Sequence, residues 1–418
     1  MKILVFNAGS SSQKSRLYEV GDTLPDLAPT PLWQADADWA HHPGTTSLKI
    51  TTGDTVLEEN LQTDARPEVI THMLESLRSG KTRVIEQLSA IDIVGHRVVH
   101  GGEEFEESVF VTPEVKEAIA RLAVLAPEHN PANLEGIEAI ERVLPSVPQV
   151  AVFDTAFHRA MPLSAVVYPV PYAWYEQEGI RRFGFHGISH DYCAHRAAQV
   201  LGRDLSTLRL ITCHLGNGAS LAAIRQGRSI DTTMGFTPME GVMMGSRSGS
   251  IDPGILLYLL REKKYSVEQL NTTLNKASGL KGVAGSGDMR QVLSDMHEGD
   301  MRAKLAFEVY AHRLRFYIGA MLASLGGLDA LVFAGGVGEN AAAVRTAACE
   351  SFGFLGIELD EQKNAQSPAD EDIAAPDSAV RVVIVHTQED WAIAQDPLCR
   401  ARASLAPPYT VGRFAGVW

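Results

Sequence analysis

Residues 6–14 read FNAGSSSQK and combine side chains that suit a phosphate group. Gly9 would let the backbone come close to a ligand, while the hydroxyls of Ser10 and Ser12 and the ammonium group of Lys14 would meet its oxygens. We interpret the stretch as a phosphate-binding turn. A solvated, serine-rich hairpin is the alternative, because the P-loop pattern GxxxxGK followed by Ser or Thr is absent.

Two further glycine-rich stretches follow apolar runs, HLGNGAS at 214–220 and FAGGVGEN at 333–340. The second is not a dinucleotide-binding fingerprint, because the pattern GxGxxG is incomplete there. Three such turns at strand ends predict a nucleotide that lies in a cleft between two domains, with its phosphates held by backbone N–H groups.

Two arginines stand in settings that suit anion binding. Arg97 lies between apolar neighbours in GHRVVHGGE, and Arg247 lies in the glycine- and serine-rich loop MMGSRSGSIDPG. A guanidinium group matches carboxylates and phosphates with two parallel hydrogen bonds. The alternatives are a structural ion pair for Arg97 and plain surface charge for Arg247.

Acidic and histidine side chains mark other strand ends. Asp154 follows an apolar run, where it could handle a ligand or cap the next helix. His186 and His190 have the spacing of a metal pair, but no third ligand is evident, so we expect His186 to donate to an oxyanion instead. Glu389 and Asp390 stand at a strand-to-helix junction, where one of them could hold Mg²⁺ through its waters.

Short β-branched runs alternate with longer helical patterns, which is typical of an α/β protein with mostly buried sheets. The strands are predicted at 2–8, 91–100, 149–155, 208–216, 220–226, 330–336 and 380–387. The clearest helices are predicted at 113–126, 133–144, 188–201, 301–325 and 388–396. Residues 3–20 and 210–227 share the order strand, polar turn, strand, which indicates two related domains with a boundary near Val150. Two hairpins that merely look alike remain the alternative.

The composition limits the possible functions. A chain of 418 residues is long enough for two or three domains, and its net charge of -14 argues against binding to a nucleic-acid backbone. The four cysteines form no CxxC pair, so a reducing cytoplasm is the expected location. The apolar run at 317–338 is broken by glycines and an aspartate, so we expect a buried helix followed by a buried strand rather than a membrane span.

The motifs NAGSSS, GHRVVHGG, DTAFH, RRFGFHGISH, HLGNGAS and GGVGEN, in this order, resemble those of the acetate kinases. This family belongs to the superfamily of sugar kinases, actin and heat-shock chaperone ATPases, and the resemblance extends from Met1 to about Asp396. It implies an α/β fold of two RNase-H-like domains with a nucleotide cleft between them. The first would span 1–150 and be completed by the C-terminal helix at about 387–418, and the second would span 151–386 and serve nucleotide binding and dimerisation.

The resemblance also implies a reaction. ATP and acetate would give ADP and acetyl phosphate, reversibly, by direct in-line transfer in a homodimer, with Mg²⁺ or, as the alternative, Mn²⁺. Because acetate is already ionised at neutral pH, the enzyme needs no strong base, so we assign Asp154 to orienting an arginine or the metal shell. The rival readings are a propionate or butyrate kinase of the same family and a non-enzymatic, nucleotide-driven module.

Site residues carried over from the family fall into five groups. Asn7 and Glu389 match the magnesium positions, and Asp154, His186 and Arg247 match the catalytic ones. Arg97 matches the acetate-binding arginine. The apolar acetate pocket corresponds to Val99, Phe185 and Pro238. Besides Ser10, Ser12 and Lys14, the nucleotide positions are His214, Leu215, Gly216, Asn217, Gly218, Asp288, Met289, Arg290, Gly336, Val337, Gly338, Glu339 and Asn340.

Four features depart from the family pattern. Glu128 stands where leucine is usual beside the acetate methyl group, and Gln13 stands where an apolar residue is usual. Ser246 and Ser250 replace the usual threonine and aspartate, and the loop GVAGSGDMR is one residue short. None of them removes a catalytic group, but they leave the acyl-chain and nucleotide preferences open.

Overall fold

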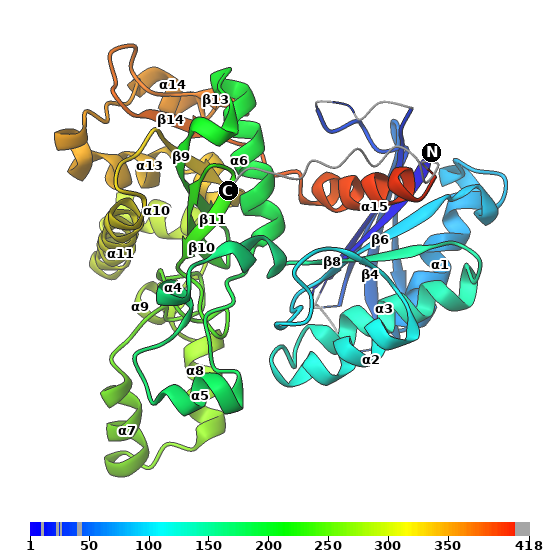
Figure 1. Ribbon diagram of the computed structural model, residues 1–418, viewed down its shortest axis with the longest axis horizontal. Helices are drawn as coiled ribbons and strands as arrows, with labels where there is room; N and C mark the ends of the chain where they lie inside the picture. Colours follow the sequence, from blue (N-terminus) through cyan, green and yellow to red (C-terminus); the bar gives the residue numbers. More distant parts are fainter. Residues whose placement is uncertain (10–11, 22–24, 26, 40–43, 406–418) are drawn as a thin grey trace, which may run out of the picture. The chain divides into compact units, whose positions relative to one another are not determined.

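The computed structural model describes residues 1–9, 12–21, 25, 27–39 and 44–405, with side chains as far as residue 397. It divides the chain into two compact units (Figure 1). The first consists of Met1–Ala156 and the segment that begins at Gln388, and the second is Phe157–Thr387. The first unit extends beyond residue 150 because the strand at 149–153 pairs within its sheet.

The sheet of the first unit contains eight strands in the order β5-β4-β3-β2-β1-β6-β8-β7. Their bounds are β1 Lys2–Ala8, β2 Ser12–Glu19, β3 Trp33–Asp38, β4 Thr46–Thr52, β5 Thr55–Leu61, β6 Ile93–Val98, β7 Val109–Phe110 and β8 Gln149–Phe153. Strand β1 is antiparallel to β2 and parallel to β6, which is parallel to β8. The carboxyl ends of β1, β6 and β8 therefore meet at one edge of the sheet, where α/β proteins place ligand-binding groups.

The sheet of the second unit contains six strands in the order β11-β10-β9-β12-β14-β13. Their bounds are β9 Arg209–Leu215, β10 Ala219–Arg225, β11 Arg228–Thr232, β12 Ala330–Ala334, β13 Glu371–Asp372 and β14 Arg381–Ile384. Strand β9 is antiparallel to β10 and parallel to β12, and β12 is parallel to β14. This is the arrangement of β3-β2-β1-β6-β8, with β1-β2 matching β9-β10, so the repeat predicted at 3–20 and 210–227 is confirmed.

Helices cover both sheets. Those of the first unit are α1 Arg66–Arg78, α2 Pro113–Arg121, α3 Asn130–Val143 and α15 Glu389–Leu405. Those of the second are α4 Leu163–Val166, α5 Tyr172–Glu178, α6 Gly187–Leu201, α7 Pro253–Glu262, α8 Val267–Lys276, α9 Gly279–Ala284, α10 Met289–His297, α11 Met301–Leu325, α12 Gly335–Asn340, α13 Ala342–Cys349 and α14 Glu361–Gln366. Predicted strands and helices were mostly right in position but wrong at their ends, as in α2, which stops at Arg121 and gives way to a 3₁₀ turn.

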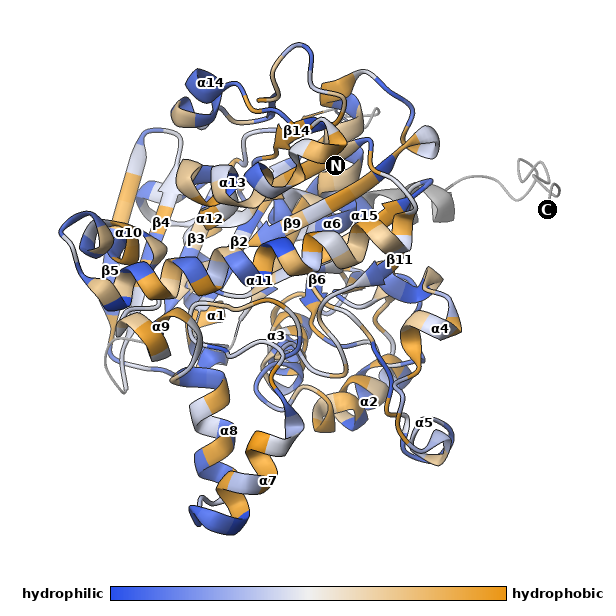
Figure 2. Cartoon of the chain, turned by 90° about the vertical axis from the view of Figure 1, so that its left-hand side faces the viewer, coloured by the Kyte–Doolittle hydropathy of each residue, from blue (hydrophilic) through white to orange (hydrophobic). Residues whose placement is uncertain are grey.

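Helix α11 has the predicted bounds. The carboxylate of Asp300 accepts from the N–H groups of Arg302 and Ala303 at 2.7 and 2.9 Å, and Gly326 ends the helix in the left-handed conformation at φ 69°. Figure 2 shows that apolar and polar residues alternate along it, and the buried strand β12 follows. Among the described residues, no helix is both long and apolar enough to span a membrane.

The stretch FAGGVGEN differs from its prediction. Strand β12 ends at Ala334, and the next six residues form the short helix α12 rather than an open turn. Gly335 has φ 74°, and a Cβ there would lie 2.9 Å from the carbonyl oxygen of Leu215. Only glycine allows this close approach of α12 to the end of β9.

Helix α15 returns the end of the chain to the first sheet. It packs against β1 and β6, where a Cβ on Gly95 would lie 2.9 Å from Cγ of Pro397 and 3.2 Å from the carbonyl oxygen of Ile393. Trp391 is buried, and its ring meets that of Tyr18 edge to face with centroids 5.3 Å apart. This packing fixes the start of α15, and with it Glu389 and Asp390, at the first sheet.

Candidate functional site

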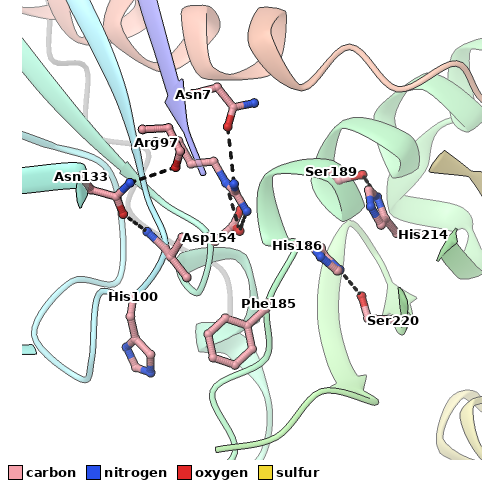
Figure 3. Close-up of polar contacts among 12 residues, drawn as sticks. Asn7, Arg97, His100, Asn133, Asp154, Phe185, His186, Ser189, His214 and Ser220 are labelled. Atoms are coloured by element: carbon pink, nitrogen blue, oxygen red, sulfur yellow. Dashed lines mark hydrogen bonds and ion pairs between the residues drawn. The ribbon is translucent and has the colours of Figure 1, made fainter. Parts of the chain in front are cut away.

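Arg97 and Asp154 form an ion pair at the edge of the first sheet (Figure 3). Arg97 is on β6 and Asp154 directly follows β8, and Oδ2 of Asp154 accepts from Nη2 and Nε of Arg97 at 2.5 and 3.2 Å. Burial opposes the charge on Arg97, but the carboxylates of Asp154 and Glu389 outweigh it and raise the pKa of Arg97. The Asp154 carboxylate, which is 3% exposed, thus holds the guanidinium group and does not cap the following helical turn.

Asn7, at the end of β1, connects Arg97 to the start of α15. Its Oδ1 accepts from Nη1 of Arg97 at 3.4 Å, and its Nδ2 donates to Oδ1 of Asp390 at 3.0 Å. Oδ2 of Asp390 lies 3.3 Å from Nε of Arg16, which also pairs with Asp36 at 2.8 Å. The position of Asn7 is therefore fixed from two sides.

The donor set at this edge fits a hard divalent cation. Asn7 offers an amide oxygen and Glu389 a half-buried carboxylate, and both are close enough to Arg97 to interact with its charge. In the described part of the chain, no three His, Cys, Asp or Glu side chains are grouped as metal ligands. A cation held here would therefore keep most of its waters, as Mg²⁺ does.

Two buried asparagines of α3 were missed in the sequence. Oδ1 of Asn133 accepts from the N–H of Val99 at 3.1 Å, and its Nδ2 donates to the carbonyl of Ala8 at 3.0 Å. Asn130 binds both the N–H and the carbonyl of His100, each at 3.1 Å. These side chains lock the ends of β1 and β6 together, and the only signal for them was the pair of asparagines in HNPAN.

The turn between β1 and β2 is only partly described. The N–H of Gly9 donates to the carbonyl of Ser12 at 2.8 Å, and the exposed Lys14 stands opposite Asn7 in the β1–β2 register. Ser10 lies outside the described residues. Gln13 is buried, and its Nε2 donates to the hydroxyl of Ser15 at 3.2 Å, which explains how an amide is accommodated at this apolar position.

His186 occupies the start of α6 in the second unit. Its backbone is left-handed at φ 57°, its Nδ1 lies 2.9 Å from Oγ of Ser220, and its ring stacks on that of His214 with centroids 4.3 Å apart. Nδ1 of His214 lies 2.7 Å from Oγ of Ser189, as Figure 3 shows. A left-handed backbone at a non-glycine residue is costly and is held only where the surroundings impose it.

Gly218 brings His186 and Arg247 to one point. A Cβ on Gly218 would lie 3.4 Å from Nε2 of His186 and 3.5 Å from Nη1 of Arg247. Nη1 of Arg247 also donates to the carbonyl of Pro238 at 3.2 Å. The predicted catalytic pair and the glycine turn of the predicted nucleotide site are therefore adjacent.

The rest of that turn is closely packed. The N–H of Gly216 donates to the carbonyl of Gly218 at 2.9 Å, and Leu215 is buried. Asn217 fills the space beside Gly245, where a Cβ would lie 2.3 Å from its Oδ1. The turn thus presents backbone groups of fixed position.

Asp288, Met289 and Arg290 open helix α10. The Asp288 carboxylate accepts from the N–H of Arg290 at 2.9 Å and pairs with its guanidinium at 2.6 Å, which lowers the pKa of Asp288. Met289 is buried, and the side chain of Arg290 is 90% exposed. Arg290 and Asp288, whose side chain is 45% exposed, are therefore accessible to a ligand, whereas Met289 is not.

Helix α12 carries the last predicted nucleotide positions, Gly336 to Asn340. Glu339 accepts from the backbone N–H and the hydroxyl of Thr387 at 3.1 and 2.8 Å. The Asn340 amide donates to the carbonyl of Gly336 at 2.9 Å, and Val337 is half-buried. Gly336 is exposed, with open space where a Cβ would stand.

Beneath α12 lies Arg345, which the sequence did not reveal. It is fully buried, and its Nη1 donates to the carbonyls of Gly338 and Glu339 at 2.7 and 2.9 Å. Its Nε donates to Oδ1 of Asn364 at 2.7 Å. Burial lowers the pKa of Arg345 to about 10. The guanidinium supports the last carbonyls of α12 and does not face a ligand.

The predicted acetate-pocket residues are divided between the units. Val99, in the first, is buried; in the second, Phe185 is buried with its carbonyl 3.0 Å from Nε2 of His158, and Pro238 is half-buried. Glu128 is exposed, as expected if its charge turns to solvent.

The two serines that depart from the family pattern are both hydrogen-bonded. The hydroxyl of Ser246 donates to the carbonyl of Asn275 at 3.0 Å. The hydroxyl of Ser250 accepts from Tyr317 at 2.7 Å and from the N–H of Gly241 at 3.0 Å. Both serines therefore anchor the loop that carries Arg247.

The chain matches the acetokinase family over residues 2–395. It is 63% identical to the acetate kinase of Gloeobacter violaceus over 399 residues, which is 95% of this chain and 98% of that protein. The crystal structure of Porphyromonas gingivalis acetate kinase has 41% identity and a TM-score of 0.87, over 95% of this chain and 99% of that one. A propionate kinase from Francisella tularensis has 37% identity and a TM-score of 0.86, over 95% and 99%. The chain belongs to the acetokinase family.

Proposed function

We propose that this chain is an acetate kinase that transfers the γ-phosphoryl group of ATP to acetate and forms acetyl phosphate and ADP. The observation that carries the proposal is that two arginines are positioned to bind anions. Arg97 is charged and is held by Asp154, and Arg247 lies beside His186 and the glycine turn. The curated relatives named acetate kinase share about 60% of its sequence, which favours acetate over propionate as the substrate.

The reaction needs charge control rather than proton transfer. A carboxylate oxygen of acetate attacks the γ-phosphorus, the bond to the β–γ bridging oxygen breaks, and ADP leaves with the electron pair. Arg97 binds the acetate carboxylate, with Asp154 fixing the direction of its guanidinium group. Arg247 and His186 face the oxygens of the transferring group and stabilise the charge that develops there. No protein group has to accept a proton.

The nucleotide and the metal ion are assigned to the positions that the family resemblance implies. The turn at 214–218, Arg290 and helix α12 would bind the nucleotide, and Lys14 and Ser12 would bind its phosphate oxygens. Asn7 and Glu389 would hold Mg²⁺, which when bound neutralises charge on the phosphate oxygens. Val99, Phe185 and Pro238 would surround the acetate methyl group.

A hydroxylamine trap tests the proposed reaction. The purified chain with ATP, Mg²⁺ and acetate should form acetohydroxamate, and omission of the metal should abolish it. Propionate should react with a lower kcat/KM, because the pocket that fits a methyl group discriminates against one more methylene by about 1–3 kcal/mol. If no short carboxylate gave an acyl phosphate, the proposed kinase activity would be refuted. A higher kcat/KM for propionate than for acetate would refute acetate as the preferred substrate.

Gly218→Ala should separate folding from activity. Because the added methyl group meets no atom closer than 3.4 Å and φ is not positive, the melting temperature should be unchanged or slightly raised. The methyl group would nevertheless fill the space beside His186 and Arg247, so kcat/KM for ATP should fall at least about tenfold. Gly353→Ala, at an exposed turn with no atom within 4 Å of the new Cβ, is the matched control. Equal kinetics for the two variants would contradict the placement of the phosphoryl group.

We further propose that the second unit forms the homodimer through α7. None of its ten residues is buried, and Ile255, Leu257 and Tyr258 are 45%, 53% and 52% exposed. In Figure 2, parts of α7 have the colour of hydrophobic residues. Residues 254–260 carry no charge, so the same helix of a second copy could pack on them with two-fold symmetry.

The double variant Leu257→Glu, Tyr258→Glu should be monomeric, because four buried carboxylates would face each other across the proposed interface. Light scattering after size-exclusion chromatography measures the mass. A dimer that survives both substitutions, or a wild-type monomer, would contradict this interface. We also place the protein in the cytoplasm, since the buried cysteines Cys213 and Cys349 form no disulfide in the described part of the chain.

A further inference from the structure

We propose that Thr212, His190 and Ser220 form a hydrogen-bond relay that holds His186 as a neutral imidazole with its proton on Nε2. His190 and Ser220 are then positioning residues for the reaction. The inference rests on the proposed function only in the role of His186, because the proton arrangement follows from the fold of the second unit itself.

The relay consists of three contacts in the buried core between α6 and the second sheet. Oγ1 of Thr212 lies 2.7 Å from Nδ1 of His190, and Nε2 of His190 lies 2.8 Å from Oγ of Ser220. Oγ of Ser220 in turn lies 2.9 Å from Nδ1 of His186. Thr212 is 1% exposed, and His190 and Ser220 are 0% exposed, so no water competes for these groups.

His190 is neutral in this setting. Burial lowers the pKa of His190 well below its ordinary value, and the neighbouring rings of His158 and His214 act in the same direction. A neutral imidazole has one N–H donor and one acceptor nitrogen. One of its two neighbours, Thr212 or Ser220, must therefore donate to it, and the other must accept from it.

Counting the protons leaves one arrangement in which each hydroxyl proton has an acceptor. If Thr212 donates to Nδ1 of His190, then Nε2–H of His190 donates to Ser220, and the hydroxyl of Ser220 donates to Nδ1 of His186. In the reverse order, Nδ1–H of His190 would point at Thr212. Within the described residues the Thr212 hydroxyl makes no hydrogen bond except this one, so its own buried proton would lack an acceptor, which is costly.

The consequence concerns how His186 meets the phosphoryl group. With Nδ1 accepting from Ser220, a neutral His186 carries its proton on Nε2, the nitrogen that lies 3.4 Å from the Cβ position of Gly218. Arg247 lies at the same point and already supplies a full positive charge. His186 therefore contributes a directed N–H hydrogen bond to a phosphoryl oxygen, and the relay opposes a second cation next to the guanidinium group.

The proton position can be measured directly in the intact protein by NMR with ¹⁵N-labelled histidine. We expect Nε2 of His186 to be protonated and Nδ1 to be a hydrogen-bonded, unprotonated nitrogen at neutral pH. In Ser220→Ala and Thr212→Val, which remove only a hydroxyl group, the Nδ1 signal should move toward that of a free ring. His195→Gln, which alters an exposed histidine of the same helix, assigns one peak and should leave His186 unchanged. A proton on Nδ1 of His186 in the wild type would overturn the inference.

Kinetics supply a second, separate readout. Ser220→Ala should lower kcat by about tenfold to a hundredfold, with KM for acetate changed less than about twofold, as for other residues that orient a catalytic group. Ser220→Thr keeps the hydroxyl and should recover most of the loss, which a purely structural role would not require. Unchanged kcat in Ser220→Ala would overturn the positioning role. Should the wild type form no acetyl phosphate, the proposed function fails, while the NMR signals still decide the proton arrangement.

Discussion

Replacement of Arg247 by alanine is expected to lower kcat for acetyl phosphate formation by about a thousandfold or more, the loss typical of an arginine that stabilises a phosphoryl transition state. The guanidinium group lies beside His186 at Gly218, and its Nη1 donates to the carbonyl of Pro238 at 3.2 Å. Next to His186 and the glycine turn, the charge of Arg247 can stabilise the oxygens of the transferring phosphoryl group. The melting temperature should change little.

The assay is the rate of hydroxamate formation at saturating ATP and acetate. Arg315→Ala, which removes an arginine of α11 that pairs with Glu350 at 2.9 Å, is the matched control and should retain full activity. If Arg247→Ala had a near-normal kcat, another group would have to stabilise the charge on the transferring phosphoryl group.

Asp154→Asn is expected to lower kcat/KM for acetate by about a hundredfold, because the neutral amide no longer fixes the direction of Arg97. The change keeps the shape of the side chain but leaves a buried guanidinium without its principal partner. The free energy of unfolding should fall by about 2 kcal/mol, less than for a fully buried pair because the Arg97 side chain is 18% exposed.

A matched control separates stability from activity. Asp329 pairs with Arg209 at 3.0 Å where β9 and β12 begin, at the opposite ends of these strands from the glycine turns. Asp329→Asn should also lower the free energy of unfolding but leave kcat/KM intact. Equal kinetic losses in the two variants would mean that Asp154 acts only through stability.

The sequence predicted those parts of the fold that depend on local patterns. Helix α11 was predicted at its observed bounds because Asp300 caps it and Gly326 ends it. The repeat of strand, turn and strand was visible because β1 and β9 are mostly apolar runs, each followed directly by a glycine, Gly9 or Gly216. In contrast, the helical form of α12 was not predicted, since it depends on the packing of Gly335 against Leu215.

The sequence missed the long-range contacts of the site and the supporting residues that such contacts define. The hydrogen bond between Asn7 and Asp390 joins residues 383 positions apart, and the amide of Asn133 reaches Ala8 across 125 positions. Arg345 resembles any helical arginine in the sequence, and only its burial beneath α12 reveals its role. Residue type and spacing identify candidates for chemistry, but the groups that hold them are chosen by the tertiary fold.

The stereochemical course at phosphorus tests the central claim most directly, since every assigned role assumes transfer from ATP to acetate in one in-line step. The enzyme would be given ATP whose γ-phosphorus is chiral through oxygen isotopes, and the configuration of the acetyl phosphate formed would be determined. Direct displacement predicts inversion. Retention would reveal two successive transfers through a phosphorylated residue of the protein, and would contradict the account.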